Sequence, residues 1–161
     1  SGAEENTDKT EPSEIVMDLS LQKALSVAPK FQGKTVLAAD TVVVTGDVIL
    51  GKPKSEEDAL RMLRLLSGKT HSVFTGVTII FPDGEKDCFC SETKVTMHDN
   101  SDELLMDYIS TGEPMDKAGA YGIQEWIGMI GIKAIEGCYY NVVGLPVATL
   151  YDKLRKRFLS R

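Results

Sequence analysis

The sequence has 161 residues, of which 42% are hydrophobic and 26% are charged, and its formal net charge is −6 at pH 7. These values are typical of one globular domain and exclude a disordered chain. The acidic balance argues against a nucleic-acid partner, because contacts with many phosphates need a basic face, whereas a single nucleotide needs only a few well-placed cations. No apolar run approaches the roughly 20 residues of a membrane span, so we expect no membrane partner.

The cysteines, Cys88, Cys90 and Cys138, are odd in number. Two of them are too close in sequence for an ordinary bridge, and no Cys/His set has the spacing of a zinc site. We therefore expect reduced thiols and a cytoplasmic protein. The chain begins with Ser-Gly and shows no signal peptide. We expect residues 1–14 to be a polar N-terminal segment, either an artificial extension or a loop, before one domain over residues 15–161.

The first half of the chain alternates between helix and strand patterns. Apolar residues at helical spacing predict an amphipathic helix over residues 13–28. The apolar, β-branched run 35–44 predicts a strand buried on both faces, and residues 48–50 predict a short return strand. Ser55, followed by three acidic residues, predicts the capped start of another helix.

The second half contains a hairpin and further helices. Residues 72–81 and 85–97 predict two long strands joined by a Pro-Asp-Gly turn. We expect a helix over residues 102–110, a strand over 129–135 and a helix over 146–158, whose terminal lysines and arginines form a solvated face. This order predicts an α/β protein with a mixed sheet.

The glycine-rich segment 112–124 also carries two carboxylates, a lysine, a proline and a glutamine. Glycine suits a backbone that bends sharply and approaches a ligand closely. Charges of both signs, together with an amide, equip the segment to hold an anionic ligand and a metal ion. The alternative is an ordinary solvated loop.

Three polar residues outside this segment are candidates for the same chemistry. Asp40 interrupts an apolar strand, where a charge is costly unless it is paired or binds a metal. If the strand ends nearby, Asp40 lies at its carboxyl edge, the usual ligand side of an α/β sheet; the alternative is a carboxylate that caps a neighbouring turn. Lys52, in a stiff Gly-Lys-Pro turn, is a phosphate ligand or a surface lysine. Glu92 shares a strand face with Lys94 and either joins Asp40 in holding Mg²⁺ or forms an ion pair across strands.

Six motifs follow one another along the chain. They are residues 39–43 (ADTVV), 51–53 (GKP), 71–77 (HSVFTGV), 92–95 (ETKV), 112–124 (GEPMDKAGAYGIQ) and 141–146 (NVVGLP). In these motifs, from about residue 15 to residue 158, the sequence resembles the Maf family of nucleoside triphosphate pyrophosphatases. That resemblance implies a fold related to the inosine triphosphate pyrophosphatases, with an elongated mixed sheet flanked by helices and a central nucleotide-binding cleft.

The resemblance also implies an activity and a set of site residues. The expected reaction is hydrolysis of a nucleoside triphosphate to the monophosphate and pyrophosphate, with Mg²⁺ or Mn²⁺ as cofactor, and the expected assembly is a homodimer. Asp40 corresponds to the general base, and Thr41 and Gln124 mark the branch that acts on dTTP and UTP. Lys52 and Lys117 are assigned to the substrate phosphates. The expected metal ligands are Asp40, Glu92, Glu113 and Asp116.

The sequence departs from the family at its start. Maf proteins begin with a strand and a Ser-x-x-Arg-Arg motif that contacts phosphate, and neither is found in this sequence. We therefore expect a Maf-like domain without that strand and motif. The alternative to an active pyrophosphatase is a non-catalytic nucleotide-binding or interaction module that has lost the arginines.

Overall fold

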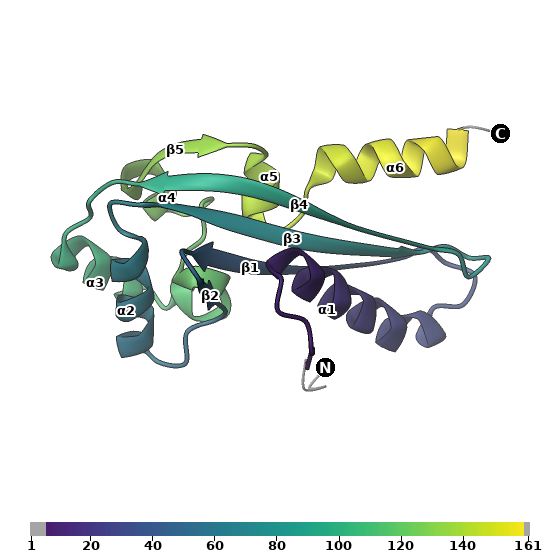
Figure 1. Ribbon diagram of the computed structural model, residues 1–161, viewed down its shortest axis with the longest axis horizontal. Coiled ribbons are helices and arrows are strands. Elements are labelled where there is room, and N and C mark those ends of the chain that lie inside the picture. Colours follow the sequence, from purple (N-terminus) through teal and green to yellow (C-terminus); the bar gives the residue numbers. More distant parts are fainter. Residues whose placement is uncertain (1–5, 160–161) are drawn as a thin grey trace.

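The computed structural model describes residues 6–159, so residues 1–5 of the expected N-terminal segment lie outside it (Figure 1). The strands are β1 (Val36–Thr45), β2 (Val48–Leu50), β3 (Thr70–Ile80), β4 (Lys86–Met97) and β5 (Ile132–Glu136). The α-helices are α1 (Pro12–Val27), α2 (Glu56–Leu66), α3 (Asp102–Ser110), α4 (Trp126–Gly131), α5 (Tyr139–Val143) and α6 (Val147–Leu159). Short 3₁₀ segments are η1 (Ala28–Lys30), η2 (Glu113–Asp116) and η3 (Ala118–Ala120).

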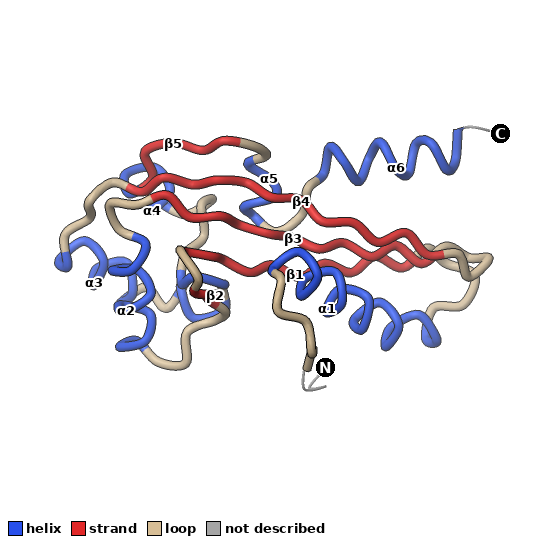
Figure 2. Tube along the Cα trace, in the orientation of Figure 1, coloured by secondary structure: helices blue, strands red, loops and turns tan. Residues whose placement is uncertain are grey.

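The strands form one sheet in the order β2-β1-β3-β4-β5. An α/β architecture with an elongated sheet flanked by helices is thereby confirmed, and Figure 2 shows the long β3–β4 ribbon passing α2 and α3 at one end and α1 and α6 at the other. The pairing is not mixed within residues 6–159, since each strand pair there is antiparallel. The reason lies in the β1–β2 turn, which reverses the chain before α2 carries it to β3 on the other side of β1.

The outer edge of β1 is only partly paired. Among the described residues β2 covers it at 43–45, and no strand covers the rest. The expectation that this strand is buried on both faces is also wrong, because the side chain of Leu37 is 44% exposed.

Helix α1 packs on the face of the sheet that carries Asp40. Residues paired across antiparallel strands share a face, and Asp40, Gly76 and Cys90 are in register. A Cβ on Gly76 would lie 2.2 Å from the carbonyl oxygen of Val16, so only glycine lets the helix come this close. Ser20 Oγ and Thr78 Oγ1, 2.8 Å apart, add a hydrogen bond across the same contact.

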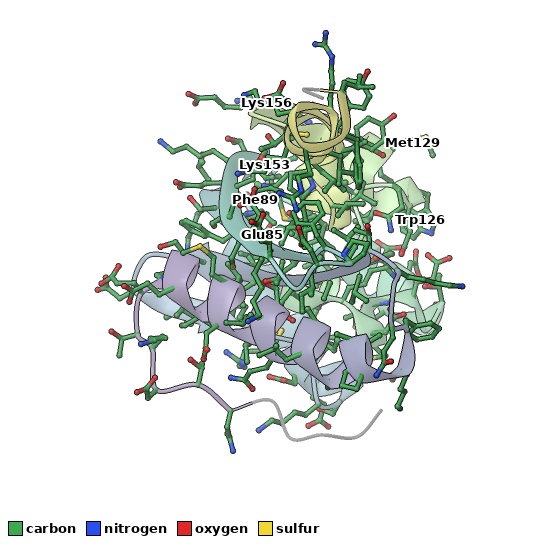
Figure 3. All side chains as sticks on the ribbon, turned by 90° about the vertical axis from the view of Figure 1, so that its right-hand side faces the viewer. Glu85, Phe89, Trp126, Met129, Lys153 and Lys156 are labelled. Carbon is green, nitrogen blue, oxygen red and sulfur yellow. The ribbon has the colours of Figure 1, made fainter. Side chains whose placement is uncertain are left out.

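The other face carries α2 and α3 at one end and α6 at the opposite end. Figure 3, which looks along the long axis, shows α1 and α6 on opposite sides of the sheet. The α6 cations were expected on a solvated face, but Lys153 Nζ lies 3.1 Å from Asp87 Oδ2 and 4.8 Å from the centre of the Phe89 ring. Arg157 likewise binds Asp83 and Glu85 of the β3–β4 turn, so this end of α6 is fastened to the hairpin.

The predicted strand over residues 129–135 is wrong in its first half. Residues up to Gly131 belong to α4, and β5 begins at Ile132. A Cβ on Gly128 would lie 1.8 Å from the carbonyl oxygen of Ile123, so the chain turns here more tightly than a strand allows. Short apolar runs do not distinguish helix from strand, which accounts for the error.

Candidate active site

A cavity of about 460 Å³ lies at the edge of β1. Its walls come from α1, β1, the turn at residues 51–52, β3, α5 and the glycine-rich segment 112–124. The polar side chains that line it are Lys23, Asp40, Thr41, Lys52, Asp116, Lys117, Tyr121 and Gln124. All the sequence-predicted site residues except Glu92 and Glu113 therefore share one cavity.

Asp40 lies in the middle of β1 rather than at its carboxyl edge, because the strand continues to Thr45. Its side chain is 12% exposed, and Lys23 Nζ lies 2.5 Å from its Oδ1. The lysine comes from α1, which crosses the same face of the sheet. This ion pair explains how a carboxylate is accommodated within an apolar strand.

Thr41 follows directly and therefore lies on the opposite face of β1. Its hydroxyl is 2.8 Å from that of Thr75 on β3. Because β2 leaves this part of the β1 edge uncovered, the cavity extends around the edge and is lined from both faces. A ligand in the cavity can thus contact Asp40 and Thr41 together.

Lys117 is held by a cluster of oxygens on the glycine-rich segment. Its Nζ lies 2.7 Å from Glu125 Oε1 and 2.9 Å from Asp116 Oδ1, and it donates to the backbone oxygen of Glu113 at 2.8 Å. Burial alone would lower the pKa of Lys117, but the bonds to Glu125 and Asp116 outweigh burial and raise it. Lys117 therefore stays protonated at neutral pH, as a phosphate ligand must.

Glu125 organises the rest of this cluster. Burial raises its pKa, but hydrogen bonds from Lys117 and from the Tyr108 hydroxyl, 2.6 Å from Oε2, bring the pKa below its usual value. The neighbouring carboxylate in turn raises the pKa of Glu113 through a hydrogen bond between the two side chains. A Cβ on Gly122 would lie 2.6 Å from Glu125 Oε1, so the glycine makes room for the charged pair.

The four predicted metal ligands do not converge. Asp40 and Asp116 line the cavity, whereas Glu92 accepts a hydrogen bond from Ser72 at 2.8 Å and Glu113 faces Glu125. Within residues 6–159 no three Asp, Glu, His or Cys side chains gather closely enough to hold a metal ion. Two carboxylates on one cavity still suit Mg²⁺, which usually keeps several waters and takes its other ligands from substrate phosphates.

Sequence reasoning missed Glu125 and did not place Lys23 in the site. Both act through partners distant in the chain, Lys23 on Asp40 and Glu125 on Tyr108 and Lys117, and no local spacing marks such pairs. Neither histidine, His71 or His98, lines the cavity. Indeed His71 is buried against Tyr121, with its Nε2 2.6 Å from the phenol oxygen, and His98 is exposed.

The fold and the site together define an α/β protein with a charged cleft at the edge of an antiparallel sheet. The chain belongs to the Maf-like protein family, which it matches over residues 1–157. It is 52% identical to a dTTP/UTP pyrophosphatase of Agathobacter rectalis, in a match that covers 95% of this chain and 82% of that protein. Two further dTTP/UTP pyrophosphatases are also similar. The protein of Nitratidesulfovibrio vulgaris is 50% identical, in a match that covers 91% of this chain and 70% of that protein. The protein of Carboxydothermus hydrogenoformans is 49% identical, in a match that covers 90% of this chain and 78% of that protein. The family expected from the motifs is confirmed.

Proposed function

We propose that this chain hydrolyses dTTP, UTP and related or modified pyrimidine nucleoside triphosphates to the monophosphate and pyrophosphate, which clears such nucleotides from the cellular pool. The observation that carries this proposal is the convergence of Asp40 with Lys23, Lys52 and Lys117 on one cavity. Cations suit a triphosphate, and a carboxylate among them suits the attacking water. The dTTP/UTP activity named for the relatives supports the choice of base.

In the proposed reaction Asp40 orients a water molecule and accepts its proton as the water attacks the α-phosphorus. The bond between the α-phosphorus and the bridging oxygen breaks, and pyrophosphate leaves. Lys52 and Lys117 neutralise the charge that develops on the phosphates, and Lys23 holds the Asp40 carboxylate in place. Positioning and charge stabilisation supply most of the acceleration in such reactions.

A divalent cation, Mg²⁺ or Mn²⁺, would add Lewis-acid stabilisation of phosphate charge. Asp40 and Asp116 are the carboxylates that would hold it, with phosphate oxygens and water completing its shell. Glu92 and Glu113 stay in the proposal only as outer groups. We also propose that the protein works as a homodimer and is located in the cytoplasm. The three cysteines are free thiols, which suits a reducing compartment. No helix within residues 6–159 is long and apolar enough to cross a bilayer.

The test is a panel of nucleoside triphosphates in which monophosphate and pyrophosphate are both quantified. We expect equal amounts of the two products from dTTP and UTP, and dependence on added Mg²⁺ or Mn²⁺. Release of orthophosphate instead of pyrophosphate would overturn the proposed bond cleavage. Binding of dTTP without any product would identify the chain as a non-catalytic nucleotide-binding module.

A further inference from the structure

The two lysines assigned to phosphate come from separate parts of the cavity wall. Lys52 lies in the turn after β2, and Lys117 lies between η2 and η3 in the glycine-rich segment. A backbone hydrogen bond joins these two parts, because the Gly119 N–H donates to the carbonyl oxygen of Gly51 at 3.0 Å. Gly51 directly precedes Lys52, and Gly119 follows closely after Lys117, so this bond fixes how far apart the two lysine backbones lie.

Gly119 can form this bond because it packs closely against β1. Its φ of 70° lies in the left-handed region that favours glycine. A Cβ at this position would lie 2.8 Å from Cγ2 of Val43, which is closer than two carbon atoms normally approach. Val43 pairs with Leu50 on one side and with Val73 on the other, so its backbone is fixed in the sheet. A side chain on residue 119 would therefore push the glycine-rich segment away from the strand and lengthen the bond to Gly51.

Ala120 is held in a backbone conformation that alanine rarely adopts. Its φ is 62°, and within residues 6–159 no other residue except glycine has a positive φ. The side chain is fully buried in the core, and the backbone N–H donates to the carbonyl oxygen of Lys117 at 3.1 Å. Such strain persists only where the surrounding contacts over-determine the conformation, and it is common at ligand sites. The turn from Lys117 to Ala120 is therefore fixed by packing.

The fixed turn brings charges from both parts of the wall together. The hydrogen bond from Lys117 is the main cause that lowers the pKa of Asp116, and the positive charge of Lys52 contributes to the same shift. Both lysines and Asp116 also line the cavity. Two cations at a fixed spacing bind two linked phosphate groups more tightly than two separate ones, because the second contact is intramolecular.

We propose that Gly119 and Ala120 are positioning residues that set the spacing of Lys52 and Lys117, so that the two lysines bind one pyrophosphate unit together. The inference rests on the proposed function, in which this unit is first the β- and γ-phosphates of the substrate and then the product that leaves. It adds to that function a basis for recognising the length of the phosphate chain, because orthophosphate reaches only one of the two lysines.

Calorimetric titration with pyrophosphate and with orthophosphate tests this inference, because it needs no turnover. In Gly119→Ala we expect the dissociation constant of pyrophosphate to rise about tenfold or more, and that of orthophosphate to stay within about twofold of the wild-type value. Loss of the fold would instead weaken the binding of both anions. Adding Val43→Ala removes the methyl groups that the new side chain would meet, and we expect the double variant to regain most of the affinity for pyrophosphate that separates Gly119→Ala from Val43→Ala alone.

Gly112→Ala is the matched control. Gly112 belongs to the same glycine-rich segment and has a φ of 76°, but a Cβ there meets no atom within 4 Å, so we expect wild-type binding of pyrophosphate. Ala120→Gly tests the second positioning residue, and it keeps the inference testable if Gly119→Ala does not fold, because glycine adopts this φ freely. Without the buried methyl group the turn is less fixed, so the affinity for pyrophosphate, but not for orthophosphate, should fall.

A wild-type ratio of the two dissociation constants in Ala120→Gly and in a folded Gly119→Ala would overturn the inference while leaving the proposed function in place. An equal change of the ratio in Gly112→Ala would do the same. A wild type that neither binds nor hydrolyses any pyrimidine triphosphate would overturn both.

Discussion

Asp40 lies in the middle of a strand, where a charged side chain needs a partner nearby. Lys23 supplies one from α1 at 2.5 Å, and the arrangement leaves the carboxylate 12% exposed to the cavity. The ion pair therefore makes a charged side chain tolerable within an apolar strand while the carboxylate still lines the cavity.

Asp40→Asn is expected to lower kcat by about 10²- to 10⁴-fold, because the amide cannot accept a proton from water. Asp87→Asn is the matched control, since it alters a Lys–Asp pair of the same kind, with Lys153, away from the cavity. Steady-state pyrophosphate release measures both variants. Near-normal turnover in Asp40→Asn would remove Asp40 from the role of base, and recovery with Mn²⁺ in place of Mg²⁺ would assign it to the metal.

Glu125→Ala is expected to destabilise the protein by about 1–3 kcal/mol, because it leaves the Tyr108 hydroxyl and the Lys117 ammonium without a common partner. Urea unfolding, with Glu136→Ala as a control at an exposed position of β5, measures the change. The variant should also weaken nucleotide binding, since Lys117 is then held mainly by the exposed Asp116. Equal stability of the two variants would show that the cluster is not held together by Glu125.

At the scale of elements, the distance between α1 and the sheet is set by Gly76. Gly76→Ala is expected to destabilise the fold by about 1–3 kcal/mol or more, because its Cβ would collide with the backbone of Val16. Gly51→Ala is the control, since a Cβ there meets no atom within 4 Å. Thermal unfolding of both variants distinguishes this collision from the general effect of adding a methyl group to glycine.

The elements that the sequence predicts well are those with local signals. Ser55 was expected to cap a helix, and its hydroxyl accepts from Asp58 N at 3.1 Å. The hydroxyl of Ser101 caps α3 in the same way and accepts from Leu104 N at 3.2 Å. By contrast, α4 and α5 have six and five residues, too few for a helical period to show, and their form depends on packing against distant strands. The same limit applies to the site. Asp40 stands out as a charge in an apolar run, but its contact with Lys23 exists only once α1 has crossed the sheet.

Burial of His71 makes the free energy of unfolding of the protein depend on pH. Burial lowers the pKa of His71 from 6.5 to about 4. Between these values the unfolded chain binds a proton that the folded protein does not, so the free energy of unfolding falls as the pH drops from about 6.5 to about 4. His71 alone contributes about 3 kcal/mol to this loss, and its contribution is fully restored above pH 6.5.

Urea unfolding at pH 7 and pH 4.5 measures this linkage. His71→Gln is expected to show a smaller difference between the two pH values than the wild type, because glutamine does not titrate. His98→Gln should keep the wild-type difference, since His98 is exposed. An unchanged difference in His71→Gln would assign the acid sensitivity to other groups.

Asp40 and Thr41 are consecutive residues of β1, so the placement of both side chains depends on the register in which β1 pairs with β3. Strand β1 pairs with β3 from Val36 opposite Ile80 to Val44 opposite Ser72. A slip of one residue in this pairing would move every side chain of β1 to the other face. The hydroxyl would then meet Lys23, and the carboxylate would meet Thr75. In such a molecule Asp40, the proposed base, and the Thr41 hydroxyl would have exchanged faces, so we expect it to be inactive, and the specific activity of a preparation would then report the fraction of molecules whose β1 is in register.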